Sequence, residues 1–166
     1  MLTTGTGLIT KTLNDNEMEA KNLRIGNYVT WIDEDDPSNA VLTLVGIYLN
    51  DAIWVEWTWE DGSNDNTDCD LETIKGIPIT EEWLNKFGFD DAEYKKGYTG
   101  VEFRTNVILD FVLTKPKFMG EWQDYYAFDL GQNRFVPMKY VHELQNLFFA
   151  VTSTELELKQ ESSACS

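Results

Sequence analysis

One acidic segment of the chain carries side chains at the spacing of an EF-hand calcium loop. Oxygen-bearing residues occupy positions 1, 3, 5, 7 and 12 of the twelve-residue window from Asp61 to Glu72. The match is incomplete, because position 6 is Asn66 rather than glycine, position 9 is Cys69, and both flanks have strand patterns. The favoured interpretation is a solvated acidic loop. Adventitious divalent-ion binding, or a metal-dependent enzyme using Asp61, Asp65 and Glu72, is the alternative.

Other reactive side chains lack the neighbours that catalysis requires. His142 is the only histidine, and we expect it to be a solvated or locally hydrogen-bonded helix residue. Neither Cys69 nor Cys165 has a histidine or a basic residue beside it in the sequence. The chain contains no Gly-x-Gly-x-x-Gly motif and no P-loop. The sequence therefore predicts no catalytic residues, no metal and no cofactor, and the protein is not expected to be an enzyme.

The charge of the chain is high and unevenly distributed. It has 13 basic and 29 acidic residues, for a net charge of −16. No lysine or arginine lies between Arg24 and Lys75, and that window holds twelve of the acidic residues. Such a surface repels nucleic acid and attracts basic surfaces over a long range. Acidic bias can also serve solubility alone.

Length and composition fit one globular domain. The chain has 166 residues, of which 42% are hydrophobic and 13% aromatic. No apolar run approaches the length of about 18 residues that suggests a membrane span, and residues 1–9 lack the pattern of a signal peptide. Two cysteines, 96 positions apart, argue against a disulfide framework. We expect a cytoplasmic protein that does not contact membranes.

The first half of the chain is patterned as strands. Four are predicted, at residues 28–32, 41–49, 53–59 and 71–79, with an acidic loop at residues 60–70. The second strand is almost wholly apolar and is expected to be buried on both faces. In the third, Ile53, Val55, Trp57 and Trp59 alternate with Trp54, Glu56 and Thr58. Short strands joined by tight turns predict a curved antiparallel sheet or an SH3-like small barrel.

The second half is predicted to contain two helices and a hairpin. Thr80 is the expected N-cap of a short helix, Glu81 and Glu82 lie in its first turn, and Gly88 follows its end. After a loop at residues 90–100, a β-hairpin is expected from residues 107–113 and 122–130. A C-terminal helix at residues 138–151 follows, with Pro137 just ahead. Its two sides are an apolar stripe (Tyr140, Val141, Leu144, Leu147, Phe148 and Val151) and a polar side (Lys139, His142, Glu143, Gln145 and Asn146).

Together these elements predict an α+β fold with the C-terminal helix packed on a sheet. Residues 21–152 are assigned to a single domain, with a flexible N-terminal extension at residues 1–20 and a polar C-terminal tail at residues 153–166. The oligomeric state is left open.

Three segments resemble a family of small proteins from phages and prophages of Bacteroidetes. They are Leu23–Val29 (LRIGNYV), Gly76–Phe89 (GIPITEEWLNKFGF) and Tyr140–Thr152 (YVHELQNLFFAVT). The resemblance covers about residues 18–156, and the family pattern starts where Met18 stands. It implies an origin in a mobile element and assigns no catalytic residues. The matching segments are those expected to form scaffold, with the acidic loops between them.

The resemblance and the charge distribution lead to one functional hypothesis. Small acidic proteins of mobile elements often inhibit host defence, as anti-CRISPR proteins do. Carboxylates on a rigid sheet would occupy the basic groove in which a host CRISPR effector, or another nuclease, holds nucleic acid. The protein itself would not bind nucleic acid. The residues expected to bind the partner are Asp33, Glu34, Asp35, Asp36, Glu60, Asp61, Asp65, Asp68 and Asp70.

Besides the metal-dependent enzyme considered above, two rival hypotheses stay open. The first is a module that sequesters a small signalling nucleotide on the aromatic-lined sheet, with basic side chains from the second half of the chain lining a pocket. The residues proposed for that pocket are Arg104, Lys115, Lys117 and Arg134. The second is a structural phage component.

Overall fold

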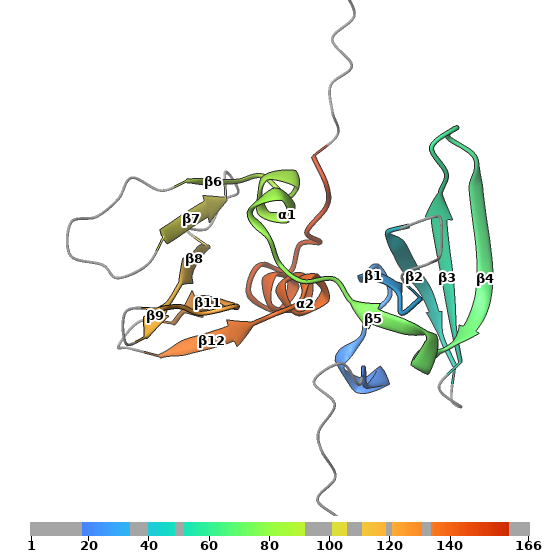
Figure 1. The fold of residues 1–166 in the computed structure, drawn as a ribbon, viewed down its shortest axis with the longest axis horizontal. Coiled ribbons are helices and arrows are strands. Elements are labelled where there is room, and N and C mark those ends of the chain that lie inside the picture. Colours follow the sequence, from blue (N-terminus) through green and yellow to red (C-terminus); the bar gives the residue numbers. More distant parts are fainter. Residues whose placement is uncertain are drawn as a thin grey trace, which may run out of the picture.

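Two antiparallel sheets lie on either side of the C-terminal helix α2 (Val141–Thr152) in the computed structural model (Figure 1). The fold is α+β, as predicted. The structure describes residues 18–33, 40–48, 52–91, 101–105, 111–118, 121–130 and 134–159.

The first sheet is formed by the acidic half of the chain. In order across the sheet its strands are β4 (Asn64–Asp70), β3 (Ala52–Thr58), β2 (Leu42–Ile47), β1 (Tyr28–Trp31) and β5 (Ile74–Gly76). Because β4 and β5 are the two edges and do not pair with each other, the sheet is open and the barrel alternative is wrong. Strand β2 has one buried face, carrying Leu42 and Leu44, rather than the two that were predicted.

The core of the first sheet is closed by chain segments outside its strands. Ile53 and Val55 of β3 are fully buried, which confirms the alternation predicted there. Met18 and Ala20, the latter in the short 3-10 helix η1 (Ala20–Asn22), pack against the same cluster. A second 3-10 helix, η2 (Leu71–Thr73), supplies the buried Leu71. Met18 and Ala20, which fall within the range assigned to the extension, are therefore packed against the fold.

Helix α1 (Glu81–Lys86) has the ends that the sequence predicts. The hydroxyl of Thr80 accepts a hydrogen bond from the Trp83 amide at 3.3 Å, which satisfies one of the free N–H groups of the first turn. Gly88 follows the helix with a φ of +85°, a conformation that side chains other than glycine rarely adopt. Trp83, Leu84 and Phe87 are buried, as expected.

The second sheet is larger than the predicted hairpin. In order, its strands are β12 (Phe135–Met138), β11 (Tyr126–Asp129), β8 (Val112–Lys115), β7 (Val101–Thr105) and β6 (Phe89–Asp91), and a separate pair is formed by β9 (Lys117–Phe118) and β10 (Glu121–Trp122). Strand β8 pairs antiparallel with β11, as the hairpin prediction requires, but it lies at residues 112–115 and overlaps the predicted first strand (107–113) only at residues 112 and 113. Residues 107–110 of that prediction lie outside the described residues. Strand β6 takes the start of the predicted loop at residues 90–100. Pro137 lies in strand β12 rather than at the start of a helix. Because β12 is an edge strand, the missing N–H of proline leaves no gap in the hydrogen bonding of the sheet.

Helix α2 begins at Val141, three residues after the predicted start. The Glu143 carboxylate accepts hydrogen bonds from the amides of Lys139 and Tyr140 at 2.7 and 3.0 Å, which fixes the turn into the helix. The predicted stripe is buried at Val141, Leu144 and Phe148. These side chains join the core of the second sheet.

Part of the polar side of α2 is buried too, contrary to the prediction. His142 is 4% exposed and Gln145 is 3% exposed. Residues 142, 145, 146 and 149 share a helical face and contact the first sheet and the segment leading into it. A helix between two sheets has to bury two faces, and here the second face is mostly polar.

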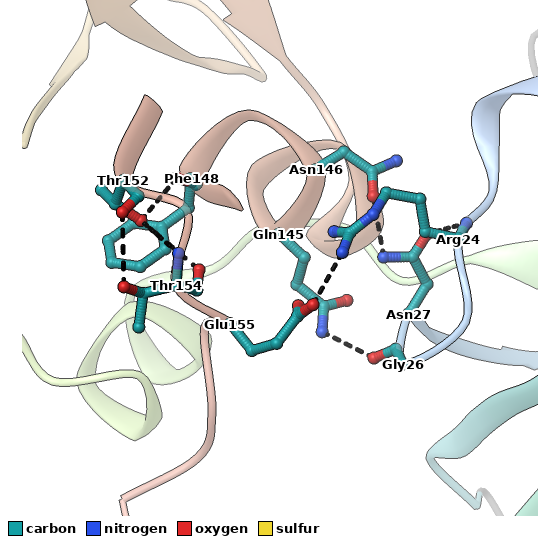
Figure 2. A network of polar contacts seen from close by, with 9 residues as sticks. All are labelled: Arg24, Gly26, Asn27, Gln145, Asn146, Phe148, Thr152, Thr154 and Glu155. Atoms are coloured by element: carbon teal, nitrogen blue, oxygen red, sulfur yellow. Dashed lines mark hydrogen bonds and ion pairs between the residues drawn. The ribbon is translucent and has the colours of Figure 1, made fainter. Parts of the chain in front are cut away.

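This polar face holds the first sheet through hydrogen bonds (Figure 2). The Gln145 side chain accepts from the Tyr28 amide at 2.8 Å and donates to the Gly26 carbonyl at 3.0 Å. Asn146 accepts from the Asn27 side chain at 3.0 Å and donates to the Asn22 carbonyl at 2.7 Å. Backbone groups that neither sheet satisfies are thereby paired by α2.

Arg24 links the same junction to the C-terminal segment. Its guanidinium pairs with Glu155 at 2.7 Å and lies 3.9 Å from the ring centroid of Phe149 (the ion pair is drawn in Figure 2). Leu156 is 4% exposed within the core of the second sheet, and the Lys159 amide donates to the Lys86 carbonyl at 2.7 Å. Residues 153–159, assigned to a polar tail, are therefore packed against the fold.

His142 lies close to Gly76 of the first sheet. Its ring is nearly parallel to that of Tyr140, at 9° and 5.7 Å between centroids. A Cβ added to Gly76 of β5 would stand 2.7 Å from the Tyr140 ring and 3.0 Å from His142 Cε1, so only glycine fits there. Within the described part of the chain, the buried His142 Nδ1 has no hydrogen-bond partner.

Replacing Gln145 tests the polar junction. Gln145→Ala leaves two partly buried backbone groups without their side-chain partner, and we expect it to lower the free energy of unfolding by about 2–4 kcal/mol. Asn146→Ala removes a more exposed pair of bonds from the neighbouring position and should have a clearly smaller effect. Urea unfolding followed by circular dichroism gives both values. Equal losses for the two variants would contradict a special role for Gln145.

The stability of the fold should depend on pH through His142. Burial lowers the pKa of His142 below its ordinary value of 6.5, and this outweighs the opposing effect of the Glu143 charge. The unfolded chain therefore binds the proton more readily, so the stabilising contribution is complete above about pH 6.5 and decreases as the pH falls towards the folded-state pKa. The expected slope is at most about 1.4 kcal/mol per pH unit.

The His142→Phe variant isolates this effect, since the chain has no other histidine. Unfolding free energies measured from about pH 7 down to pH 5 should decrease more steeply for the wild type than for the variant. Parallel curves would show that the fold does not lower the pKa of His142 below its value in the unfolded chain.

Candidate partner-binding surface

Six of the nine predicted partner-binding residues lie in the described part of the chain, and all six are exposed. Five of them are on or beside β4, and the sixth, Asp33, follows β1. Glu34, Asp35 and Asp36 lie outside the described residues. The candidate surface is therefore built from the β3–β4 hairpin.

The predicted acidic loop is mostly a strand. Only residues 60–63 form a turn, and residues 64–70 pair with β3 along their whole length. The Trp59 amide donates to the Ser63 carbonyl at 2.8 Å, and the Gly62 amide donates to the Trp59 carbonyl at 2.9 Å. Thr67 and Cys69 are the half-buried residues of β4. They give β4 an inner face that packs on the sheet, although most of its residues have low β-propensity.

The Asp61 side chain stabilises this turn. One carboxylate oxygen accepts from both the amide and the hydroxyl of Ser63, at 2.9 and 2.6 Å. These hydrogen bonds lower the pKa of Asp61. Asp61 therefore has a structural role in the turn, in addition to the predicted role in binding a partner.

Pairing with β3 divides the acidic side chains between two faces. Asp65 stands opposite Trp57, on the face that carries Val55 and Ile53. Asp68 stands opposite Trp54, and Asp70 lies two residues further along the same face. We call this second set the outer face. Its members are Trp54, Glu56, Asn66, Asp68 and Asp70.

The outer face holds its charges at fixed spacing. Hydrogen-bonded pairs alternate along an antiparallel ladder, and the 59–63 pair is hydrogen-bonded. Trp54–Asp68 and Glu56–Asn66 therefore occupy the positions where opposite side chains come closest. Asp68 and Asp70 are about 7 Å apart along the strand, and Glu56 lies diagonally about 7–8 Å from Asp68.

Glu56 and Trp54 are the members of this face that sequence reasoning missed as site residues. The alternation of Asn64, Asn66, Asp68 and Asp70 with Thr67 and Cys69 was the available signal. It would have placed Asp68 and Asp70 together if residues 64–70 had been interpreted as a strand.

The EF-hand spacing does not produce a metal site. Ser63 and Asp61 are bonded to each other in the turn, whereas Asp65, Thr67 and Cys69 follow one another along an extended strand. An EF-hand instead curls its ligands around one ion. In the described ranges, no three side chains of His, Cys, Asp or Glu gather in a metal-binding arrangement.

Cys69 is not an activated nucleophile. Partial burial raises the pKa of its thiol, and the charges of Asp70 and Asp68 raise it further, against a smaller lowering by a hydrogen bond with Thr73. A raised pKa keeps the sulfur protonated at neutral pH, whereas nucleophilic catalysis needs the thiolate.

Aromatic residues of the first sheet pack mainly on one another. Trp31, Trp57 and Trp59 form an edge-to-face series with centroid distances of 6.2 and 5.8 Å. In the second sheet, Lys115 lies 5.5 Å from the ring centroid of Tyr126, whose pKa is raised to about 12, mainly by burial. Arg134 is exposed, and the side chains of Arg104 and Lys117 lie outside the described set. The hypothesis of a signalling-nucleotide pocket stays a prediction.

Comparison of the chain with protein-family models, curated proteins and solved structures found no match. In the described residues, no helix is long and apolar enough to span a bilayer. The candidate surface is therefore argued from its own geometry.

The turn role of Asp61 is testable against Asp68. Asp61→Ala removes both hydrogen bonds to Ser63, and we expect it to lower the midpoint of thermal unfolding. Asp68→Ala removes an exposed carboxylate for which we find no such role and relieves like-charge repulsion, so the midpoint should stay the same or rise. Differential scanning calorimetry of both variants decides the point. A larger drop for Asp68→Ala would reverse the assignment.

Proposed function

We propose that this is a binding protein of a phage or other mobile element that inhibits a nucleic-acid-binding host protein. The partner is a CRISPR effector or another defence nuclease, and the inhibition is anti-CRISPR-like mimicry of nucleic acid. The observation that carries the proposal is the outer face, where Glu56, Asp68 and Asp70 are exposed on one rigid hairpin. The resemblance of residues 18–156 to phage and prophage proteins supports the mobile-element origin.

The electrostatics favour a basic partner. The window between Arg24 and Lys75 contributes twelve negative charges and no positive ones, so no basic residue of the window itself offsets them. A groove that binds phosphates is lined with lysine and arginine, and opposite potentials speed the encounter of two such surfaces. A nucleic acid would be repelled from the same face.

The remainder of the fold acts as scaffold in this proposal. Helix α2 holds the first sheet through Gln145 and Asn146, at the opposite end of the sheet from β4. The protein performs no catalysis and acts in the cytoplasm of the bacterial host, where the defence systems operate.

Neutralising the outer face tests the proposal. The tagged wild type and a Glu56→Gln/Asp68→Asn/Asp70→Asn triple variant are used to recover partners from a Bacteroidetes host lysate at low and high salt. We expect a basic nucleic-acid-binding protein to be recovered by the wild type at low salt. Its affinity for the triple variant should be lower by on the order of tenfold, with a weaker salt dependence.

A matched control removes the same number of charges elsewhere. The Glu81→Gln/Glu121→Gln/Glu157→Gln variant should bind the recovered protein as the wild type does. Purified partner is then assayed for nucleic-acid binding or cleavage with each variant. A partner whose affinity is indifferent to the outer-face charges and to salt would overturn the proposal of mimicry.

A further inference from the structure

The outer face contains a large aromatic side chain, that of Trp54, which its neighbours leave substantially exposed. Trp54 is 41% exposed, although it lies in the middle strand of the β2–β3–β4 ladder. Its cross-strand neighbours are Gly46 on β2 and Asp68 on β4. Gly46 has no side chain to place against the indole, and the short Asp68 side chain carries a charge that favours solvent.

The position of Trp54 differs from that of the other exposed tryptophan of the hairpin. Trp59 is 40% exposed, but its ring packs edge-to-face against Trp57 at 5.8 Å. We find no comparable ring contact for Trp54 among the described residues. Exposed aromatic residues of this kind are enriched among the side chains that dominate binding energy.

We propose that Trp54 anchors the partner by stacking against an arginine side chain, whose guanidinium is also bonded by Asp68 or Glu56. An indole face attracts a cation, and a carboxylate beside it can accept two hydrogen bonds from the same planar group. The arrangement combines both features on adjacent strands. Lysine is a poorer fit, because its ammonium is a strongly hydrated point charge that neither stacks nor bonds in a fork.

This inference rests on the proposed function for the nature of the partner, a protein with a basic nucleic-acid-binding groove. The inference specifies arginine as the partner side chain that the outer face binds. It also assigns to Trp54 the discrimination of arginine from lysine. Mimicry by carboxylates alone has no need of Trp54.

The test uses two labelled probes of equal length, an oligo-arginine and an oligo-lysine peptide, titrated against the full chain by fluorescence anisotropy. We expect the wild type to bind the arginine peptide more tightly. Trp54→Ala should weaken that binding about two- to fivefold, leave the lysine peptide nearly unchanged and so remove the preference. Trp59→Ala, which removes an equally exposed indole, should retain the preference, provided circular dichroism shows that it is folded.

The outcomes separate this inference from the proposed function. If Trp54→Ala keeps the arginine preference, or if the wild type has none, the inference is overturned. The mimicry proposal survives that result if the outer-face triple variant still weakens binding of both peptides and of the recovered partner. The triple variant could instead leave the binding of the peptides and of the recovered partner unchanged, while Trp54→Ala removes the preference for arginine. That result would overturn the mimicry proposal and support the contact between Trp54 and arginine.

Discussion

A single helix has to satisfy two sheets, and the rest of the structure depends on how it does so. Helix α2 presents an apolar stripe (Val141, Leu144 and Phe148) to one sheet and a mainly polar stripe to the other. The apolar contact supplies hydrophobic stabilisation, which has little directional preference. The polar contact is directional, because Gln145 pairs with one N–H and one C=O at fixed positions. These hydrogen bonds therefore help to fix the orientation of the first sheet, together with the packing of the Tyr28 ring against Trp83 and Phe87.

The polar face of α2 explains why buried polar groups are tolerated at the junction between α2 and the first sheet. Tyr28 is the first residue of β1 and Gly26 lies two residues before it, and there α2 pairs the Tyr28 amide and the Gly26 carbonyl. Gly76 then allows the rings of Tyr140 and His142 to approach β5 directly. Two buried nitrogen atoms at this junction, Nδ1 of His142 and Nη1 of Arg24, have no described hydrogen-bond partner. Burial lowers the pKa of His142, so a positive charge on its ring is disfavoured there.

The features that the sequence predicted are those with local physical causes. The cap at Thr80, the glycine at position 88 and the alternation of Ile53 and Val55 each follow from a few neighbouring residues. The second buried face of α2 does not, because Gln145 and Asn146 are as typical of a solvated face as of a hydrogen-bonded one. Strand β4 was missed for a related reason. Its residues favour loops in isolation, and its register comes from β3 and the turn at residues 59–63.

The composition of β4 also limits the tendency of an exposed edge strand to pair with another chain. An open edge offers backbone groups on which another chain can add. Here the Asn66 amide is bonded by the Asp65 side chain and the Asp68 carbonyl by the Thr67 hydroxyl, so part of the edge is satisfied internally. A second copy would also bring its own carboxylates against these, at a repulsive distance. The acidic side chains thereby oppose self-association through the edge while leaving the outer face available to a cationic partner.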